Sequence, residues 1–140
     1  MKEKFFLDTN LIFYCSGNIG YRWAVKVMEI IAKNKNSAIV DALFFQEILD
    51  RFDYLNNKNK GEMIYKNARK LLNNIVEINV KDFDNSYELY KKYSTVTPRL
   101  FLRIATMKKT GIKKICSTFS ANLESIDEIT RINLMEKVSK

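Results

Sequence analysis

The chain has 140 residues, of which 46% are hydrophobic and 29% charged, and its formal net charge is +8. This length predicts one domain spanning residues 1–140, and four glycines with a single proline make long linkers improbable. Because histidine is absent, Ser-His triads, Cys-His dyads and the usual zinc sites are excluded, and hydrolytic chemistry would depend on carboxylates and a hard cation.

No apolar run reaches the roughly 20 residues that a membrane-spanning helix needs, and no signal peptide precedes the first strand-like run. We therefore expect a cytoplasmic protein without membrane contact. The cysteines, Cys15 and Cys116, lie in apolar segments without metal-site spacing, which favours reduced, packed thiols over a disulfide. The excess of lysine indicates a surface that attracts polyanions such as RNA or DNA. The alternative is a lysine-rich soluble protein without such a partner.

Short apolar runs alternate with amphipathic segments along the chain. Strands are predicted at residues 5–7, 37–40, 75–80, 113–118 and 128–132. One helix is predicted to begin at Asn10, and further helices to span 21–34, 42 to about 56, 60–73, 86–93 and 99–110, where Gly111 ends the last one. This order predicts an α/β fold in three layers, with a mostly parallel sheet of about five strands flanked by helices.

Two aspartates stand where predicted strands end, Asp8 after the first and Asp41 after the second. The carboxyl ends of parallel strands open on one edge of the sheet, which is where ligands bind in open α/β folds. A buried carboxylate is costly unless something pairs with it, so Asp8 is expected either to cap a helix or to hold a cation. For Asp41 capping of the next helix is the favoured role.

Three segments in this order resemble the PIN domains, and especially the short VapC-type form of prokaryotic toxins. They read "FLDTNLIFY", "DALFFQEILDRF" and "TPRLFLRIATMKKTGIKKICSTFSANLESIDEITRI", so the resemblance runs nearly end to end. It implies a PIN-like fold and a ribonuclease in which three or four carboxylates hold Mg²⁺ or Mn²⁺. Carried over by position, it assigns Asp8 and Glu47 as catalytic metal ligands, with Thr9 or Asn10 orienting the site.

The sequence departs from the family at the expected positions of the further aspartates. Leu100 follows "TPR", Phe119 follows "ST", and Ala121 stands two residues later. None of these side chains offers an oxygen to a hard cation, so the resemblance implies a weak or absent Mg²⁺ or Mn²⁺ site and an inactive or weakened nuclease. We expect Phe119 to plug the crevice in part.

The polar residues around the crevice are candidates for substrate binding. They are Thr9, Asn10, Arg99, Arg103, Ser117 and Thr118. With two aspartates lost, Arg99 could neutralise Asp8 and Glu47 without a metal, and Arg103, one helical turn further, could reach the same crevice.

Three functions remain open at this point. The first is a degenerate PIN-domain protein that binds RNA or a protein without cutting. The alternative is an active metal-dependent endoribonuclease using Asp8, Asp41 and Glu47, or Glu124 in place of a lost ligand. The third is an interaction module that dimerises and binds an antitoxin-like protein. Tyr87, Tyr90 and Tyr93 would serve that surface, unless they belong partly to the core.

Overall fold

Five parallel strands form the sheet in the described part of the chain. The computed structural model describes residues 3–11, 28–93, 96–117 and 123–132. The strands are β1 (Phe5–Leu7), β2 (Ala38–Asp41), β3 (Asn74–Val76), β4 (Lys114–Cys116) and β5 (Thr130–Ile132). They lie in the order β3-β2-β1-β4-β5, and each neighbouring pair is parallel. The predicted α/β fold with a parallel sheet of about five strands is confirmed.

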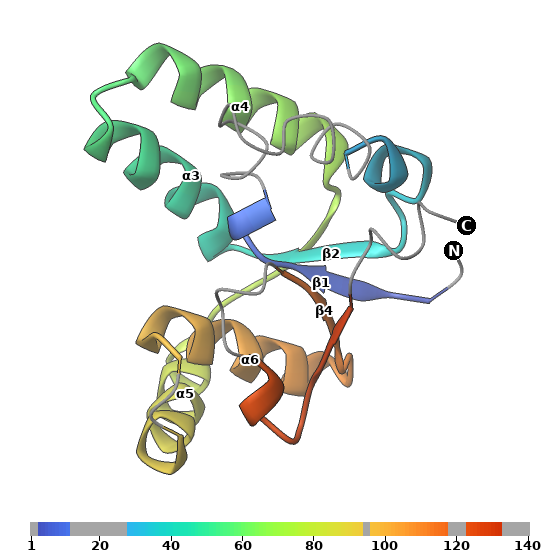
Figure 1. Cartoon of the computed structure of the whole chain (residues 1–140), viewed down its shortest axis with the longest axis vertical. Helices are drawn as coiled ribbons and strands as arrows, with labels where there is room; N and C mark the ends of the chain where they lie inside the picture. Colours follow the sequence, from blue (N-terminus) through green and yellow to red (C-terminus); the bar gives the residue numbers. More distant parts are fainter. Residues whose placement is uncertain (1–2, 12–27, 94–95, 118–122, 133–140) are drawn as a thin grey trace.

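Helices cover both faces of this sheet (Figure 1). The pair α3 (Leu43–Tyr54) and α4 (Lys58–Leu71) lies on one face, and the pair α5 (Val80–Lys92) and α6 (Pro98–Thr110) on the other. Side chains of a strand alternate between faces, so Phe5 and Leu7 join the apolar cluster under α3 and α4, whereas Phe6 joins the cluster under α5 and α6. The three-layer arrangement follows from this alternation.

The start of α5 differs from the prediction. The β-branched run at 75–80 predicts a strand, with the next helix beginning at residue 86, but β3 ends at Val76 and α5 begins at Val80. The reason is a capping box. The Asp82 N–H donates to Asn79 Oδ1 (3.1 Å), and the Asn79 N–H donates to Asp82 Oδ2 (2.9 Å). The predicted strand over residues 77–80 is therefore wrong, because two satisfied N–H groups there favour a helix.

The other described elements lie within two residues of their predicted ends. Of the first two predicted helices, the structure describes the helical residues 10–11 and 28–33. Cys116 is buried, and Cys15 lies outside the described residues, so the predicted reduced state of the two thiols stays a prediction. Among the helices that the structure describes, none is long and apolar enough to span a bilayer.

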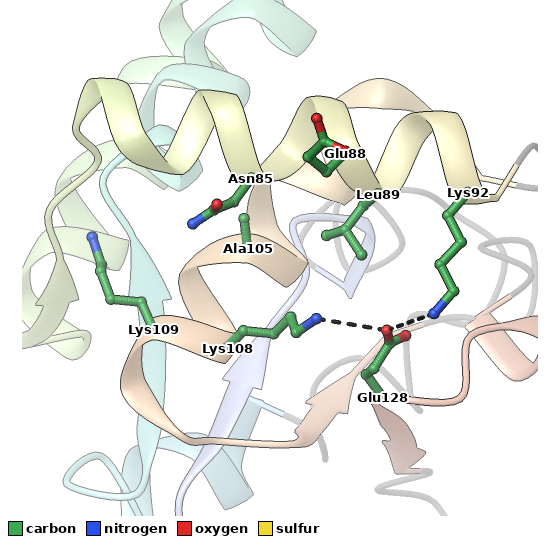
Figure 2. Close-up of a pocket in the computed structure, with 8 residues that line it drawn as sticks. All are labelled: Asn85, Glu88, Leu89, Lys92, Ala105, Lys108, Lys109 and Glu128. Carbon is green, nitrogen blue, oxygen red and sulfur yellow. Dashed lines mark hydrogen bonds and ion pairs between the residues drawn. The ribbon is translucent and has the colours of Figure 1, made fainter.

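Glu128 connects α5 and α6 to the segment before β5. Its carboxylate accepts hydrogen bonds from the Tyr93 hydroxyl (2.8 Å) and Lys92 Nζ (3.2 Å), and Lys108 Nζ lies 3.6 Å away. Figure 2 shows both lysines directed at Glu128 across a hollow of about 590 Å³ between the two helices. Charged side chains of α5, α6 and the segment before β5 thus meet at this hollow.

Gly61 allows α3 and α4 to approach closely, and its replacement should be costly. A Cβ at residue 61 would lie 2.7 Å from the Cβ of Phe52, an atom that cannot move without the backbone of α3. We expect Gly61→Ala to lower the free energy of unfolding by about 1–3 kcal/mol in urea denaturation, despite the higher helix propensity of alanine. The control Asn67→Ala, at an exposed position of α4, should change it by less than about 0.5 kcal/mol. Equal stability of the two variants would contradict the close approach.

Candidate functional site

Three acidic side chains meet at the carboxyl edge of the central strands. Asp8 follows β1, Asp41 ends β2, and Glu47 lies in the second turn of α3. Because β1 and β2 are adjacent and parallel, their ends lie side by side. The exposed fractions of Asp8, Asp41 and Glu47 are only 4%, 0% and 3%. Three carboxylates buried this deeply require a positively charged partner.

That partner is the guanidinium of Arg103, from the buried face of α6, which is only 1% exposed. Its Nε donates to Asp41 Oδ2 (3.0 Å) and its Nη2 to Asp41 Oδ1 (3.2 Å). Its Nη1 donates to Asp8 Oδ1 (3.0 Å), and Nη2 also donates to Glu47 Oε1. One planar cation therefore contacts all three carboxylates, in the two-point geometry that arginine favours with Asp41.

Neutral hydroxyl groups occupy further acceptor positions of this network. Ser117 Oγ, at the end of β4, donates to Asp8 Oδ2 (2.6 Å). Thr9 Oγ1 donates to Glu47 Oε2 (2.9 Å). Within the described part of the chain, every buried side-chain nitrogen and oxygen has a hydrogen-bond partner. The network is therefore complete without an additional ligand.

Asp41 fills two roles at once. Its Oδ1 accepts a hydrogen bond from the Phe44 N–H (3.1 Å), which satisfies a free donor at the start of α3, and the same carboxylate binds Arg103. Sequence reasoning favoured the capping role for Asp41 and made it a metal ligand only in the alternative of an active endoribonuclease. The signal for its second role was the position directly beside Asp8 at the sheet edge.

The remaining predicted site residues lie at the rim or outside the described residues. Arg99 Nη1 is 3.5 Å from Glu47 Oε2, and the Arg99 side chain is 56% exposed. The structure therefore gives the central position to Arg103 and leaves Arg99 at the edge. Asn10 is half-buried at the start of a helical turn. Thr118, Phe119, Ala121 and Glu124 have no described side chains, so the Phe119 plug stays a prediction.

Burial and neighbouring charges shift the pKa values of Glu47 and Arg103. Burial raises the pKa of the Glu47 carboxyl above its ordinary value of 4.5, although Arg103 and Thr9 favour the charged form. Burial lowers the pKa of Arg103, but the charges of Asp41, Glu47 and Asp8 outweigh it, so this pKa lies above its usual range. Arg103 therefore stays protonated, and Glu47 couples the network to pH.

This arrangement does not fit Mg²⁺ or Mn²⁺. The oxygens of Asp8, Asp41 and Glu47 accept hydrogen bonds from Arg103, and a divalent cation beside that guanidinium would be repelled. Among the described residues, no group of three or more Asp, Glu, Cys or His side chains has the geometry to hold a metal ion. Leu100, which stands where the sequence resemblance leads one to expect an aspartate, packs in the apolar cluster under α5 and α6.

The raised pKa of Glu47 predicts a measurable pH dependence. Because the folded protein binds this proton more tightly than the unfolded chain, the free energy of unfolding should fall as pH rises from 4.5 toward the higher folded pKa. We expect Glu47→Gln to remove this contribution, so that the free energy of unfolding, measured by urea denaturation at several pH values from 4.5 upward, declines less with pH than in the wild type. The control Glu62→Gln, at an exposed position of α4, should keep the wild-type slope. A steeper decline in Glu47→Gln than in the wild type would contradict the raised pKa.

Comparison with known proteins finds similar structures but no similar sequences. No model of a known protein family matches the sequence, and no curated protein does. VapBC2 from Rickettsia felis, bound to a DNA fragment from its promoter, gives a TM-score of 0.71 at 14% identity, over 92% of this chain and 97% of that one. VapC20 from Mycobacterium tuberculosis, a toxin that cleaves the sarcin–ricin loop, gives a TM-score of 0.71 at 11% identity, over 89% of this chain and 95% of that one.

A third similar structure comes from another complex of this kind. DNA-bound VapBC from Salmonella typhimurium gives a TM-score of 0.70 at 16% identity, over 93% of this chain and 97% of that one. All three likenesses extend over nearly the full length of the compared chain, at 97%, 95% and 97%. The chain therefore has the PIN-domain fold of the VapC-type toxins.

Proposed function

We propose that this protein is a VapC-like PIN-domain protein that binds RNA without cutting it, because Arg103 takes the place of a metal ion among the carboxylates. The observation that carries this proposal is the buried guanidinium shared by Asp8, Asp41 and Glu47. Metal-dependent hydrolysis needs a cation that both activates water and contacts the phosphate. A buried arginine offers no such water and is closed off from a phosphate.

A basic face on α4 supports contact with nucleic acid. Lys58, Lys66, Arg69 and Lys70 are exposed there, and Glu62 is the one acidic residue of this helix. Within the described part of the chain, Lys58, Lys66 and Lys70 pair with no carboxylate. Unpaired cations along one helix attract a phosphate backbone independently of sequence.

A protein partner is the second candidate, favoured by the kind of structures that this chain resembles. VapBC2 and VapBC are complexes, and another similar structure is a toxin–antitoxin complex from Klebsiella pneumoniae (TM-score 0.63, 15% identity). An antitoxin-like protein would be the corresponding partner here. An active endoribonuclease built on Asp8, Asp41 and Glu47 is the contrasting function, and it requires these carboxylates to release Arg103.

Labelled RNA incubated with Mn²⁺ tests binding and cleavage together. We expect binding that weakens steeply with salt, and intact RNA on a denaturing gel. Replacing Lys58, Lys66 and Lys70 with glutamine should weaken binding and reduce the slope of log K against log salt by about 2, at about 0.7 per contact. The control replaces Lys33, Lys35 and Lys113, which removes the same charge from other exposed positions. Cleavage that disappears in Asp8→Asn would overturn the proposal.

Removing the Arg103 guanidinium should destabilise the protein and open the site to a metal. Arg103→Ala removes the one buried counterion of the three carboxylates and leaves only the exposed Arg99 near Glu47, so we expect a loss of about 3–5 kcal/mol in the free energy of unfolding. Mn²⁺ should then raise the Tm of this variant in calorimetry, because an ion that binds only the folded state stabilises it. The Tm of the wild type should not respond to Mn²⁺.

Two further variants make this experiment decisive. Arg99→Ala, at the rim, should cost less than about 1 kcal/mol and stay insensitive to Mn²⁺. If Arg103→Ala does not fold, Arg103→Ala with Asp41→Asn removes one buried charge together with the guanidinium and serves in its place. A rise in the wild-type Tm with Mn²⁺ would show that the carboxylates are free to bind metal, and would contradict the proposal.

A further inference from the structure

The hollow between α5 and α6 lies outside both the carboxylate network and the basic face of α4. Its volume is about 590 Å³, within the range of about 300–1,000 Å³ that small-molecule sites occupy. Figure 2 shows it bordered by side chains of the two helices, with Glu128 of the segment before β5 at one side. A space of this size between two packed helices can take up a small ligand.

Contacts near both ends of the helix pair keep the two helices in place beside the hollow. Close to the start of α5, Lys109 Nζ of α6 donates to Asp82 Oδ2 at 2.6 Å, and Asp82 is only 1% exposed. At the end of α5, the ring of Tyr93 stacks with that of Phe101 of α6, with centroids 6.4 Å apart. The hollow is therefore framed by the fold and does not depend on one side chain.

Apolar and short side chains border the hollow between these contacts. Leu89 of α5 and Ala105 of α6 both border it, and both are buried. Asn85, an exposed residue of α5, adds an amide that can donate and accept hydrogen bonds. An apolar wall with a few polar groups at its edge is the usual composition of a small-molecule site.

Two lysines at the hollow share one carboxylate. Lys92 Nζ and Lys108 Nζ lie 3.2 Å and 3.6 Å from the same oxygen, Glu128 Oε1. The other oxygen of Glu128 accepts a hydrogen bond from the Tyr93 hydroxyl at 2.8 Å. In the part of the chain that the structure describes, neither lysine is within 4.0 Å of a second carboxylate. Two ammonium groups beside one carboxylate leave one positive charge in excess.

The other charged side chains at the hollow are paired within the protein. Lys109 is paired with Asp82, and Glu88 is paired with Lys91 at 2.9 Å. These two pairs cancel, so the excess charge of the hollow is the one beside Glu128. It lies next to the apolar wall, where an anion with an apolar part can use both.

We propose that this hollow binds a small organic monoanion, a carboxylate with an apolar body. Its carboxylate lies between Lys92 and Lys108, and its body covers Leu89 and Ala105. The two ammonium groups already bind the carboxylate of Glu128, and each has three N–H donors, so they can serve a second one. A single negative charge matches the excess of one, whereas a dianion such as inorganic phosphate would leave a negative excess.

Titration of the full chain with 3-phenylpropionate, followed by heteronuclear NMR at pH 7, tests this site. We expect the amide signals of Leu89, Ala105 and Glu128 to shift and saturate with a Kd on the order of 1 mM, as is usual for a ligand of this size. Neutral 3-phenylpropanol lacks the charge and inorganic phosphate lacks the apolar body. Neither should shift these signals at the same concentration and ionic strength.

Glu128→Gln gives the most specific outcome among the variants. Loss of the competing carboxylate frees both ammonium groups, so the affinity for 3-phenylpropionate should rise about threefold, whereas a purely structural role of Glu128 predicts a loss. Lys92→Gln with Lys108→Gln should weaken binding about tenfold. The control Lys91→Gln removes the same kind of charge from the next position, where the lysine is paired with Glu88, and should change the affinity less than about twofold.

Filling the hollow without changing its charge separates a cavity from a charged surface. Asn85→Trp should abolish the shifts while the circular dichroism matches the wild type, because residue 85 is exposed. Four outcomes would each overturn the proposal: an equal response to 3-phenylpropanol or phosphate, shifts confined to the exposed Phe83 and Tyr87, weaker binding in Glu128→Gln, or unchanged binding in Lys92→Gln with Lys108→Gln. The hollow shares no residue with the carboxylate site or α4, so its failure would leave the proposed function untouched.

Discussion

The structure depends on one constraint, the burial of three carboxylates at a single edge of the sheet. A parallel arrangement brings the ends of β1 and β2 together, and the helix after β2 adds Glu47 to the same place. Burial of these charges is tolerated because one guanidinium reaches all three. The position of α6 is thereby fixed in relation to β1, β2 and α3, which come from the other half of the chain.

The same edge is where ligands bind in open α/β folds, and in this chain the carboxylates at that edge pair with a guanidinium. A guanidinium supplies a single positive charge and five N–H donors in a plane, whereas a divalent cation supplies two charges and open coordination positions. The carboxylates thus keep the positions that the fold gives them while their oxygens are occupied by N–H and O–H groups. The proposed function, RNA binding without cleavage, is compatible with structural likeness to VapC-type toxins, because a fold does not by itself fix the function of its site.

Much of the fold can be predicted from the order of apolar runs, because buried parallel strands and amphipathic helices differ in the spacing of their apolar residues. The strand at Phe5–Leu7 is an example, since an apolar run ending in Asp8 is unambiguous. The start of α5 could not be predicted in this way, because β-branched residues around Val76 favour a strand, and the decisive contact between Asn79 and Asp82 spans only three residues. Local capping outweighed strand propensity there.

The site was predictable in its members but not in their arrangement. Asp8, Glu47 and both arginines stand out in the sequence, yet spacing alone does not tell whether Arg99 or Arg103 turns inward. The distinguishing signal is the neighbourhood of Arg103, an uninterrupted buried stretch from Leu100 to Met107, in which one charged residue implies a buried partner.

The wide separation of this network along the chain has a consequence for how the protein forms. Arg103 lies 95, 62 and 56 residues beyond Asp8, Asp41 and Glu47. On the ribosome the three acids emerge long before their counterion, and until α6 docks they repel one another and stay in water. The C-terminal part of the chain therefore completes the N-terminal half by supplying Arg103. A chain that lacks α6 cannot bury the three carboxylates at that edge of the sheet.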